Sequence, residues 1–258
     1  MSSATGKITA QSVALSYGPR QVLIDLSLAV EAGTMTLLAG RNGAGKSTLL
    51  NVLVGIRKPD RGDVILDGSK LADYPDRERA RTVTLIPQDS DSPFDFTGRE
   101  LVMMGRYPHV RRFGGARPED HAAVQRSLEM TDAASFADRS VHTLSGGEMR
   151  RISIARALAT EADVLLADEP TSDLDLEHAV AVLALLHDLA GQGRTVLLAS
   201  HDLNLTAPRC DRVALLHEGR ISHSGEPESV LSEEVVAQVF GIKSQAPSGY
   251  FPRHYEAL

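Results

Sequence analysis

Hydrophobic and polar residues alternate with a period of two along the N-terminal part of the chain. Residues 22–30 place an apolar side chain at every even-numbered position, which is typical of a strand with one buried face. Together with residues 8–17, this stretch predicts an antiparallel sheet. Residues 34–39 are mostly apolar and predict a fully buried strand, and residues 47–53 predict the helix that follows it.

The middle of the chain has a different character. Residues 64–66 and 82–86 predict short strands, but residues 90–144 contain helix-like segments, near 98–104 and 118–130, that are separated by turns rich in glycine and proline. This change indicates a helical subdomain inserted into a larger fold.

Strand and helix then alternate again toward the C-terminus, which is typical of a mostly parallel α/β sheet. Strands are predicted at 164–167, 195–199 and 213–217, a helix at 177–190, and a closing hairpin strand at 220–223. We therefore expect one domain over residues 1–258, with a core of residues 1–88 and 160–258 and a helical subdomain of about 89–159.

Composition narrows the class of protein. The chain has 258 residues, of which 42% are hydrophobic and 24% charged, as in ordinary globular proteins, and its net charge of −7 argues against binding nucleic acid through a basic surface. Its single cysteine, Cys210, excludes an internal disulfide framework. There is no signal-peptide pattern, and the longest apolar run, 179–186, is far shorter than the ~20 residues that cross a bilayer. Any membrane role is therefore expected to act through a partner.

Residues 40–48 carry the most informative motif, a complete phosphate-binding loop of the form G-x-x-x-x-G-K-S/T. Its glycines let successive backbone N–H groups converge on phosphate oxygens, Lys46 supplies a mobile positive charge, and the Ser47 hydroxyl can ligate Mg²⁺. The predicted strand before the loop and the helix after it place a helix N-terminus against the anion. The sequence thus predicts a nucleoside triphosphate site.

A second feature is the apolar stretch 164–167, which ends in two adjacent carboxylates, Asp168 and Glu169. Beside a phosphate loop, Asp168 is placed to hold Mg²⁺. Glu169 lies one residue further on, where a general base could meet the water that attacks the γ-phosphate.

Residues 144–148, Leu-Ser-Gly-Gly-Glu, form a third motif with two interpretations. Ser145 and Glu148 make an S-x-x-E capping box, so the motif starts a helix whatever else it does. A cap does not need Gly146 and Gly147, each of which lowers helix propensity by ~1 kcal/mol relative to alanine. A helix N-terminus that offers N–H groups and a hydroxyl to phosphate does need them.

Taken in order, these motifs resemble the ATP-binding subunits of ABC transporters, and the resemblance covers nearly the whole chain. It implies a P-loop NTPase (RecA-like) α/β core with an N-terminal antiparallel β subdomain and an inserted helical subdomain. It implies ATP and Mg²⁺ as cofactors. The nucleotide-binding residues would be Tyr17, Gly40, Asn42, Gly43, Gly45, Lys46, Ser47, Thr48, Ser145, Gly146, Gly147, Glu148 and Asp175; the catalytic residues Lys46, Gln88, Glu169 and His201; and the Mg²⁺ ligands Ser47, Gln88 and Asp168.

The resemblance also implies partners. ATP would bind between the phosphate loop of one subunit and Ser145, Gly146 and Gly147 of a second copy, in a homodimer at the cytoplasmic face of the cell membrane. Integral membrane permease subunits and an external substrate-binding protein would complete the assembly, with no nucleic acid involved. One departure concerns the loop 172–175, where Asp173 replaces the small residue common in the family.

The cargo is indicated only by subgroup motifs. Residues 96–101 and 104–109 resemble the G-R-x-P-H segment of subunits that serve metal-chelate importers. This favours ferric siderophore or haem, with vitamin B12 or molybdate as alternatives. The arginine-rich stretch 106–117 is interpreted either as a solvated loop or as a face toward the permease. A soluble ABC-type ATPase that acts on nucleic acid or the ribosome is disfavoured, because 40–145 lacks coiled-coil heptads and the chain holds one cassette.

Overall fold

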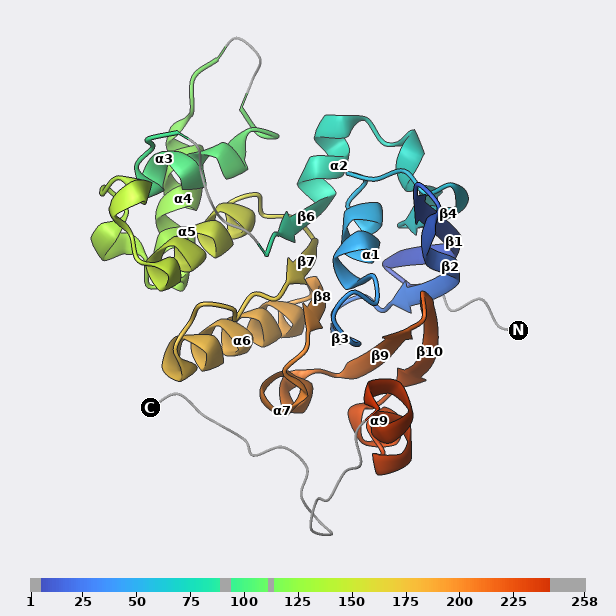
Figure 1. Ribbon diagram of the computed structural model, residues 1–258. Helices are drawn as coiled ribbons and strands as arrows, with labels where there is room; N and C mark the ends of the chain where they lie inside the picture. Colours follow the sequence, from blue (N-terminus) through green and yellow to red (C-terminus); the bar gives the residue numbers. More distant parts are fainter. Residues whose placement is uncertain (1–5, 89–93, 111–113, 242–258) are drawn as a thin grey trace.

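A six-stranded, mostly parallel sheet forms the centre of the fold (Figure 1). The computed structural model describes residues 6–88, 94–110 and 114–241. The strand order is β10-β9-β3-β8-β7-β6, and the edge strand β10 alone runs antiparallel to its neighbour. The bounds are β3 Met35–Ala39, β6 Val83–Ile86, β7 Val164–Asp168, β8 Thr195–Ser200, β9 Arg212–His217 and β10 Arg220–Gly225.

The apolar runs predicted as buried strands lie in the middle of this sheet. Every residue of β3, β7 and β8 is buried, because both faces of the sheet are covered. On β3, Leu37 packs into the cluster under α6 (Leu176–Gly191), while Leu38 packs into the cluster around α1 (Lys46–Leu53). The strands therefore sit rigidly between two cores, with their carboxyl ends along one edge.

The predicted antiparallel sheet is a second layer, with strand order β2-β1-β4-β5. Its strands are β1 Ile8–Tyr17, β2 Arg20–Val30, β4 Arg61–Leu66 and β5 Ser69–Lys70. The even-numbered alternation along β2 is interrupted at Asp25, whose φ is 47°, and upstream of it Leu23 is fully buried instead of Ile24. The register shifts here, with Leu26 opposite Val13 but Leu23 opposite Leu15, as a β-bulge requires.

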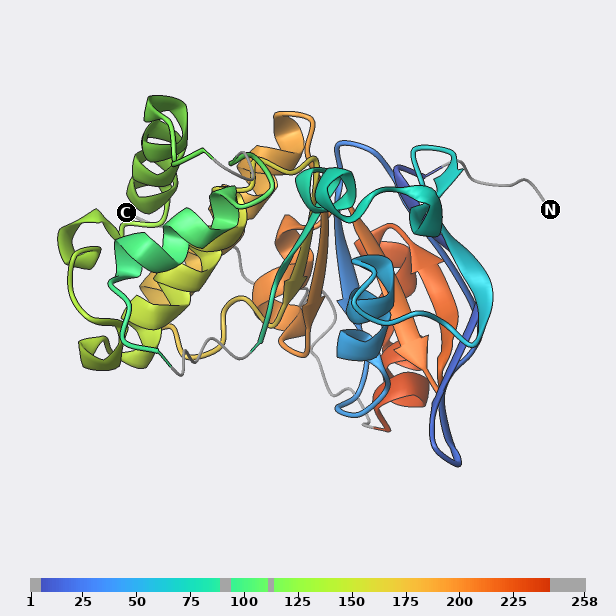
Figure 2. The ribbon, with the colours of Figure 1, turned by 90° about the horizontal axis from the view of Figure 1, so that it is seen from above.

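Three helices, α3 (Gly98–Met103), α4 (Pro118–Met130) and α5 (Gly146–Leu158), form a cluster with its own apolar core. Figures 1 and 2 show this cluster on the side of the large sheet opposite the antiparallel sheet. Both α3 and α5 begin with capping boxes, from Thr97 and from Ser145. The fold class is as predicted.

Short helices complete the described chain, and the hydrophobic pattern did not predict them. They are α2 Asp76–Thr82, α7 Leu203–Thr206, α8 Pro227–Val230 and α9 Glu233–Phe240. Among the helices of the described residues, we find none with both the length and the apolar character needed to cross a bilayer.

Candidate nucleotide-binding site

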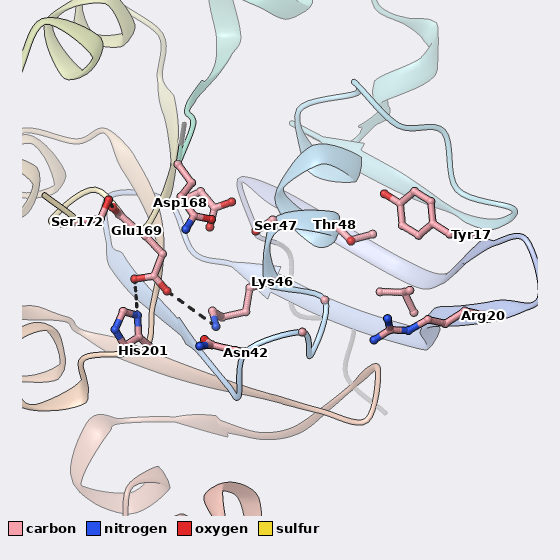
Figure 3. A pocket seen from close by; sticks show the side chains of 14 residues that line it. Tyr17, Arg20, Asn42, Lys46, Ser47, Thr48, Asp168, Glu169, Ser172 and His201 are labelled. Carbon is pink, nitrogen blue, oxygen red and sulfur yellow. Dashed lines mark hydrogen bonds and ion pairs between the residues drawn. The ribbon is translucent and has the colours of Figure 1, made fainter. Parts of the chain in front are cut away.

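A cavity of about 620 Å³ lies at the carboxyl ends of β3, β7 and β8, where the predicted motifs converge (Figure 3). Eleven predicted residues line it: Tyr17, Asn42, Gly43, Gly45, Lys46, Ser47, Thr48, Gln88, Asp168, Glu169 and His201. Arg20, Val22 and Ser172 line it as well and were not predicted.

The phosphate loop depends on glycines at two left-handed positions. Gly43 has φ 77° and Gly45 has φ 109°, conformations that side chains disfavour. At Gly45 an added Cβ would also lie 3.1 Å from the side chains of Val22 and Leu23. Gly45 is the N-cap of α1 and provides no side-chain cap, so the first turn of α1 keeps N–H groups for an anionic ligand.

Lys46 is a buried cation of this cavity and is only 7% exposed. Its Nζ donates to the Gly40 carbonyl oxygen at 2.9 Å and lies 3.9 Å from Oε1 of Glu169. Burial lowers the pKa of the Lys46 ammonium, and the carboxylates of Glu169 and Asp168 oppose that change. Gly40 does not line the cavity itself; it contributes the carbonyl that holds Lys46 in place.

Glu169 is held from several sides. Its Oε2 lies 2.9 Å from Nδ1 of His201, and Figure 3 shows its carboxylate between His201 and Lys46. The backbone has φ 47°, an uncommon value for a residue with a side chain. Its N–H donates to Ala199 at 2.9 Å, and its carbonyl accepts bonds from the N–H and the hydroxyl of Ser172. These bonds fix the carboxylate beside Lys46 of the phosphate loop.

Asp168 and Ser47 provide the oxygens that could hold a cation. Burial raises the pKa of the Asp168 carboxyl, and a hydrogen bond with the Ser47 side chain opposes that shift. The buried Oδ1 of Asp168 has no hydrogen-bond partner within the described chain. No group of three His, Cys, Asp or Glu side chains in that part of the chain could bind a metal. A cation here would therefore rest on one carboxylate, a hydroxyl and phosphate oxygens, the ligands that suit Mg²⁺.

Tyr17 lies at the other end of the cavity and is 43% exposed. The guanidinium carbon of Arg57 sits 5.5 Å from the centre of its ring, within cation–π range. An aromatic ring exposed to this extent can stack against a base. Arg20 extends along the same cavity, and an added Cβ on Gly43 would lie 3.9 Å from Nη2 of Arg20.

The predicted residues Ser145, Gly146, Gly147 and Glu148 do not line this cavity, and neither does Asp175. Ser145 and Glu148 form the predicted capping box, at 2.8 Å and 3.3 Å, and Glu148 also pairs with Arg139 at 2.8 Å. Asp175 caps α6 and contacts His178. Ser145 and Gly146 are exposed, so within one chain this helix start is separate from the phosphate loop.

Asp173, the residue that departs from the family pattern, has φ 64°. Aspartate tolerates this left-handed conformation better than most residues with a side chain. It lies against the helix start, since an added Cβ on Gly146 would meet the Asp173 Cβ at 3.7 Å.

Arg106, the first residue of the arginine-rich stretch 106–117, is neither solvated nor turned outward. Arg106 is 4% exposed and bonds to Asp120 at 3.1 Å, to Glu161 at 2.7 Å and to the Ala159 carbonyl at 2.8 Å. His109 lies 2.8 Å from the Thr160 carbonyl. Both predicted roles for Arg106 are therefore wrong, because its charge is used inside the helical cluster.

Other residues of the stretch 106–117 differ from Arg106 in exposure. Tyr107 projects outward at 76% exposure, and Arg117 is exposed as well. Residues 111–113, which include two of the arginines, fall outside the described residues.

The comparisons with known proteins agree with this site. The family model described as ABC transporter matches residues 23–172. The chain belongs to the ABC transporter family. It is 37% identical to the probable siderophore transport system ATP-binding protein of Bacillus subtilis, over 92% of this chain and 87% of that protein. It is 40% identical to the hemin import ATP-binding protein of Rhodococcus jostii, over 92% of this chain and 81% of that protein.

A solved structure points to the metal-chelate subgroup as well. An inward-facing ABC transporter assigned to the metal-chelate type superposes with a TM-score of 0.80 at 30% identity, covering 93% of this chain and 90% of that one. The predicted resemblance to metal-chelate importer subunits is confirmed, as is the predicted enzyme class, an ATPase coupled to transport.

Proposed function

We propose that this chain is the ATP-hydrolysing subunit of a membrane importer for iron chelates, either ferric siderophore or haem. The observation that carries the ATPase role is the Glu169 carboxylate, which is bonded to His201 and faces Lys46 at the mouth of the phosphate loop. The relatives named for siderophore and hemin import support the cargo class. Vitamin B12 import is the alternative, since a cobalamin import protein of Halobacterium salinarum is 40% identical over 86% of this chain.

The chemistry follows from the chain's own groups. Lys46 leaves the Gly40 carbonyl for the β- and γ-phosphate oxygens, whose charge the N-terminus of α1 also stabilises. Glu169 accepts a proton from the attacking water on a carboxylate oxygen, and His201 holds that carboxylate in place. A positioned base of this kind typically contributes 10²–10⁴-fold to the rate.

We propose Mg²⁺ as the second cofactor, held by Asp168, Ser47 and Gln88. The partnerless buried Oδ1 of Asp168 beside the Ser47 hydroxyl supports this assignment. When bound, the ion would neutralise charge on the phosphate oxygens. The ligand set is testable without turnover, because Asp168→Asn should weaken Mn²⁺ binding measured by electron paramagnetic resonance in the presence of ADP.

The site needs a second copy of the chain. Ser145, Gly146 and Gly147 do not line the chain's own cavity, and in a two-fold homodimer they would face the partner's ATP. Packing within one chain leaves ordinary contact space for a Cβ at Gly146, so this glycine is not required by its own fold. Close approach of a ligand and a partner subunit explains it better.

The remaining assignments follow the family. We propose integral membrane permease subunits and an external substrate-binding protein as partners, and a peripheral position at the cytoplasmic face of the membrane. We also propose a single nucleotide-binding domain over residues 1–258, with a core of 1–88 and 160–258 and a helical subdomain of about 89–159. The separate apolar core around α3, α4 and α5 supports that division.

The decisive experiment compares Glu169→Gln with Lys46→Ala in the purified chain. Glu169→Gln should bind ATP, lose turnover by roughly 10²–10⁴-fold and form an ATP-dependent dimer on size-exclusion chromatography. Lys46→Ala should lose ATP binding, measured by equilibrium dialysis. Unimpaired turnover in Glu169→Gln would remove Glu169 from its role as the base.

A further inference from the structure

Arg150 is a buried cation that the nucleotide site does not directly use. It lies on α5, one turn after the Ser145 cap, and is 2% exposed, which makes it the largest fully buried side chain of the described residues. A guanidinium is always charged, so burying it requires that its N–H groups find acceptors.

All five N–H donors of this guanidinium can be assigned to backbone carbonyls. Nε donates to Pro170 at 3.0 Å, and Nη2 donates to Asp168 at 2.9 Å and to Glu169 at 2.6 Å. Nη1 donates to Pro87 and, at 3.1 Å, to Gln88. One side chain thus joins the helix that starts at Ser145 to two segments, one with the proposed base and the proposed Mg²⁺ ligand Asp168, the other with the proposed Mg²⁺ ligand Gln88.

Two of these hydrogen bonds flank Glu169, whose backbone has an unfavourable conformation. Glu169 has a left-handed φ of 47°, and its carbonyl accepts from Ser172 as well as from Arg150. If the guanidinium is lost, the peptide units on both sides of Glu169 lose a fixed partner, and the carboxylate direction is less defined. A displacement of about 1 Å at a catalytic group can cost ~10²-fold in rate.

We propose that Arg150 is a positioning residue for ATP hydrolysis, which fixes the backbone of Gln88, Asp168 and Glu169 from the helix that begins at Ser145. The inference rests on the proposed function. Arg150 also connects two sites: when α5 shifts on contact with the nucleotide of a partner subunit, Arg150 transmits that displacement to Glu169 and to Gln88.

The test uses Arg150→Lys and Arg150→Gln in the full-length chain, purified with its membrane partner. Lysine keeps the charge but has three donors on a single nitrogen, so it cannot serve five carbonyls in a fork. We expect kcat to fall at least ~10-fold in both variants, with the KM for ATP within about threefold of wild type. Amide exchange over residues 164–172 should rise.

Arg126→Gln is the matched control, because Arg126 is an exposed arginine of α4 that pairs with Glu161. It should keep wild-type kcat and exchange. Wild-type kcat in Arg150→Lys overturns the inference, whether or not Arg150→Gln folds. So does a loss expressed in KM alone. If the wild-type chain shows no ATP turnover, the proposed function fails instead, so the two failures are distinguishable.

Discussion

Removing the Arg106 guanidinium should destabilise the protein strongly, although Arg106 lies in a single 3-10 turn, Met104–Arg106. Asp120 is completely buried, and its carboxylate accepts from Nε of Arg106 at 3.1 Å and from the backbone N–H of Arg117 at 3.0 Å. Arg106→Met fills the space but leaves Asp120 with the Arg117 backbone bond and a longer ion pair, in which Nε of Arg117 lies 3.8 Å from Oδ2. Breaking one side of a buried ion pair costs about 3–5 kcal/mol, and the remaining contacts place this case near the lower end.

The magnitude can be measured by urea unfolding followed by circular dichroism. A loss of about 3 kcal/mol corresponds to a fall in Tm of roughly 6–12 °C for a chain of this size. The control is Arg126→Met, which removes an exposed pair with Glu161 and should cost less than about 1 kcal/mol. In a double-mutant cycle, Asp120→Asn should reduce the cost of Arg106→Met.

The result separates two accounts of the G-R-x-P-H segment. If Arg106 were solvated or faced a permease, its replacement would leave the free energy of unfolding of the isolated chain unchanged within about 0.5 kcal/mol. A loss below about 1 kcal/mol would therefore refute the buried ion pair as the reason for this arginine.

Three further predictions follow from single contacts. Gly105→Ala should lower stability by about 1–3 kcal/mol in urea unfolding, because its Cβ would lie 2.2 Å from the Arg156 carbonyl oxygen; unchanged stability would contradict that contact. The Arg117 backbone N–H and the Arg106 guanidinium hold the pKa of Asp120 below its usual range. This group therefore stabilises the fold above its unfolded-state pKa, and the stabilisation is lost as the pH falls through its folded-state pKa. Below pH ~4, the free energy of unfolding should depend less on pH in Asp120→Asn than in wild type. Tyr17→Ala should weaken ATP binding by about 1–3 kcal/mol in titration calorimetry while Tyr17→Phe does not, and equal affinities would exclude stacking.

The sequence predicted the parts of the fold whose signal is local. Strands β3 and β7 are mostly apolar because both faces of the sheet are covered, and such stretches can be recognised in the sequence without a structure. Helix α2 has charged residues at five of its positions and buries none, so it presents no apolar face to detect. The register shift at Asp25 was not predicted either, because a β-bulge depends on the pairing with the neighbouring strand.

The residues of the site also differ in whether local sequence identifies them. The phosphate loop is contiguous in sequence, so its spacing alone identified Lys46 and Ser47. Arg20 and Ser172 reach the cavity only through tertiary packing. Arg106 and Arg150 were misread or passed over because charged side chains are usually exposed, and their acceptors lie far along the chain.

The most direct test of the account is the metal content of iron-starved cells whose only copy of this chain carries Glu169→Gln, measured by elemental mass spectrometry against wild type. The account predicts a selective fall in iron, with cobalt and molybdenum unchanged. A fall in cobalt or molybdenum with iron unchanged would contradict the iron-chelate cargo. No change in any of the three metals, with redundant importers deleted, would contradict the role in metal-chelate import altogether.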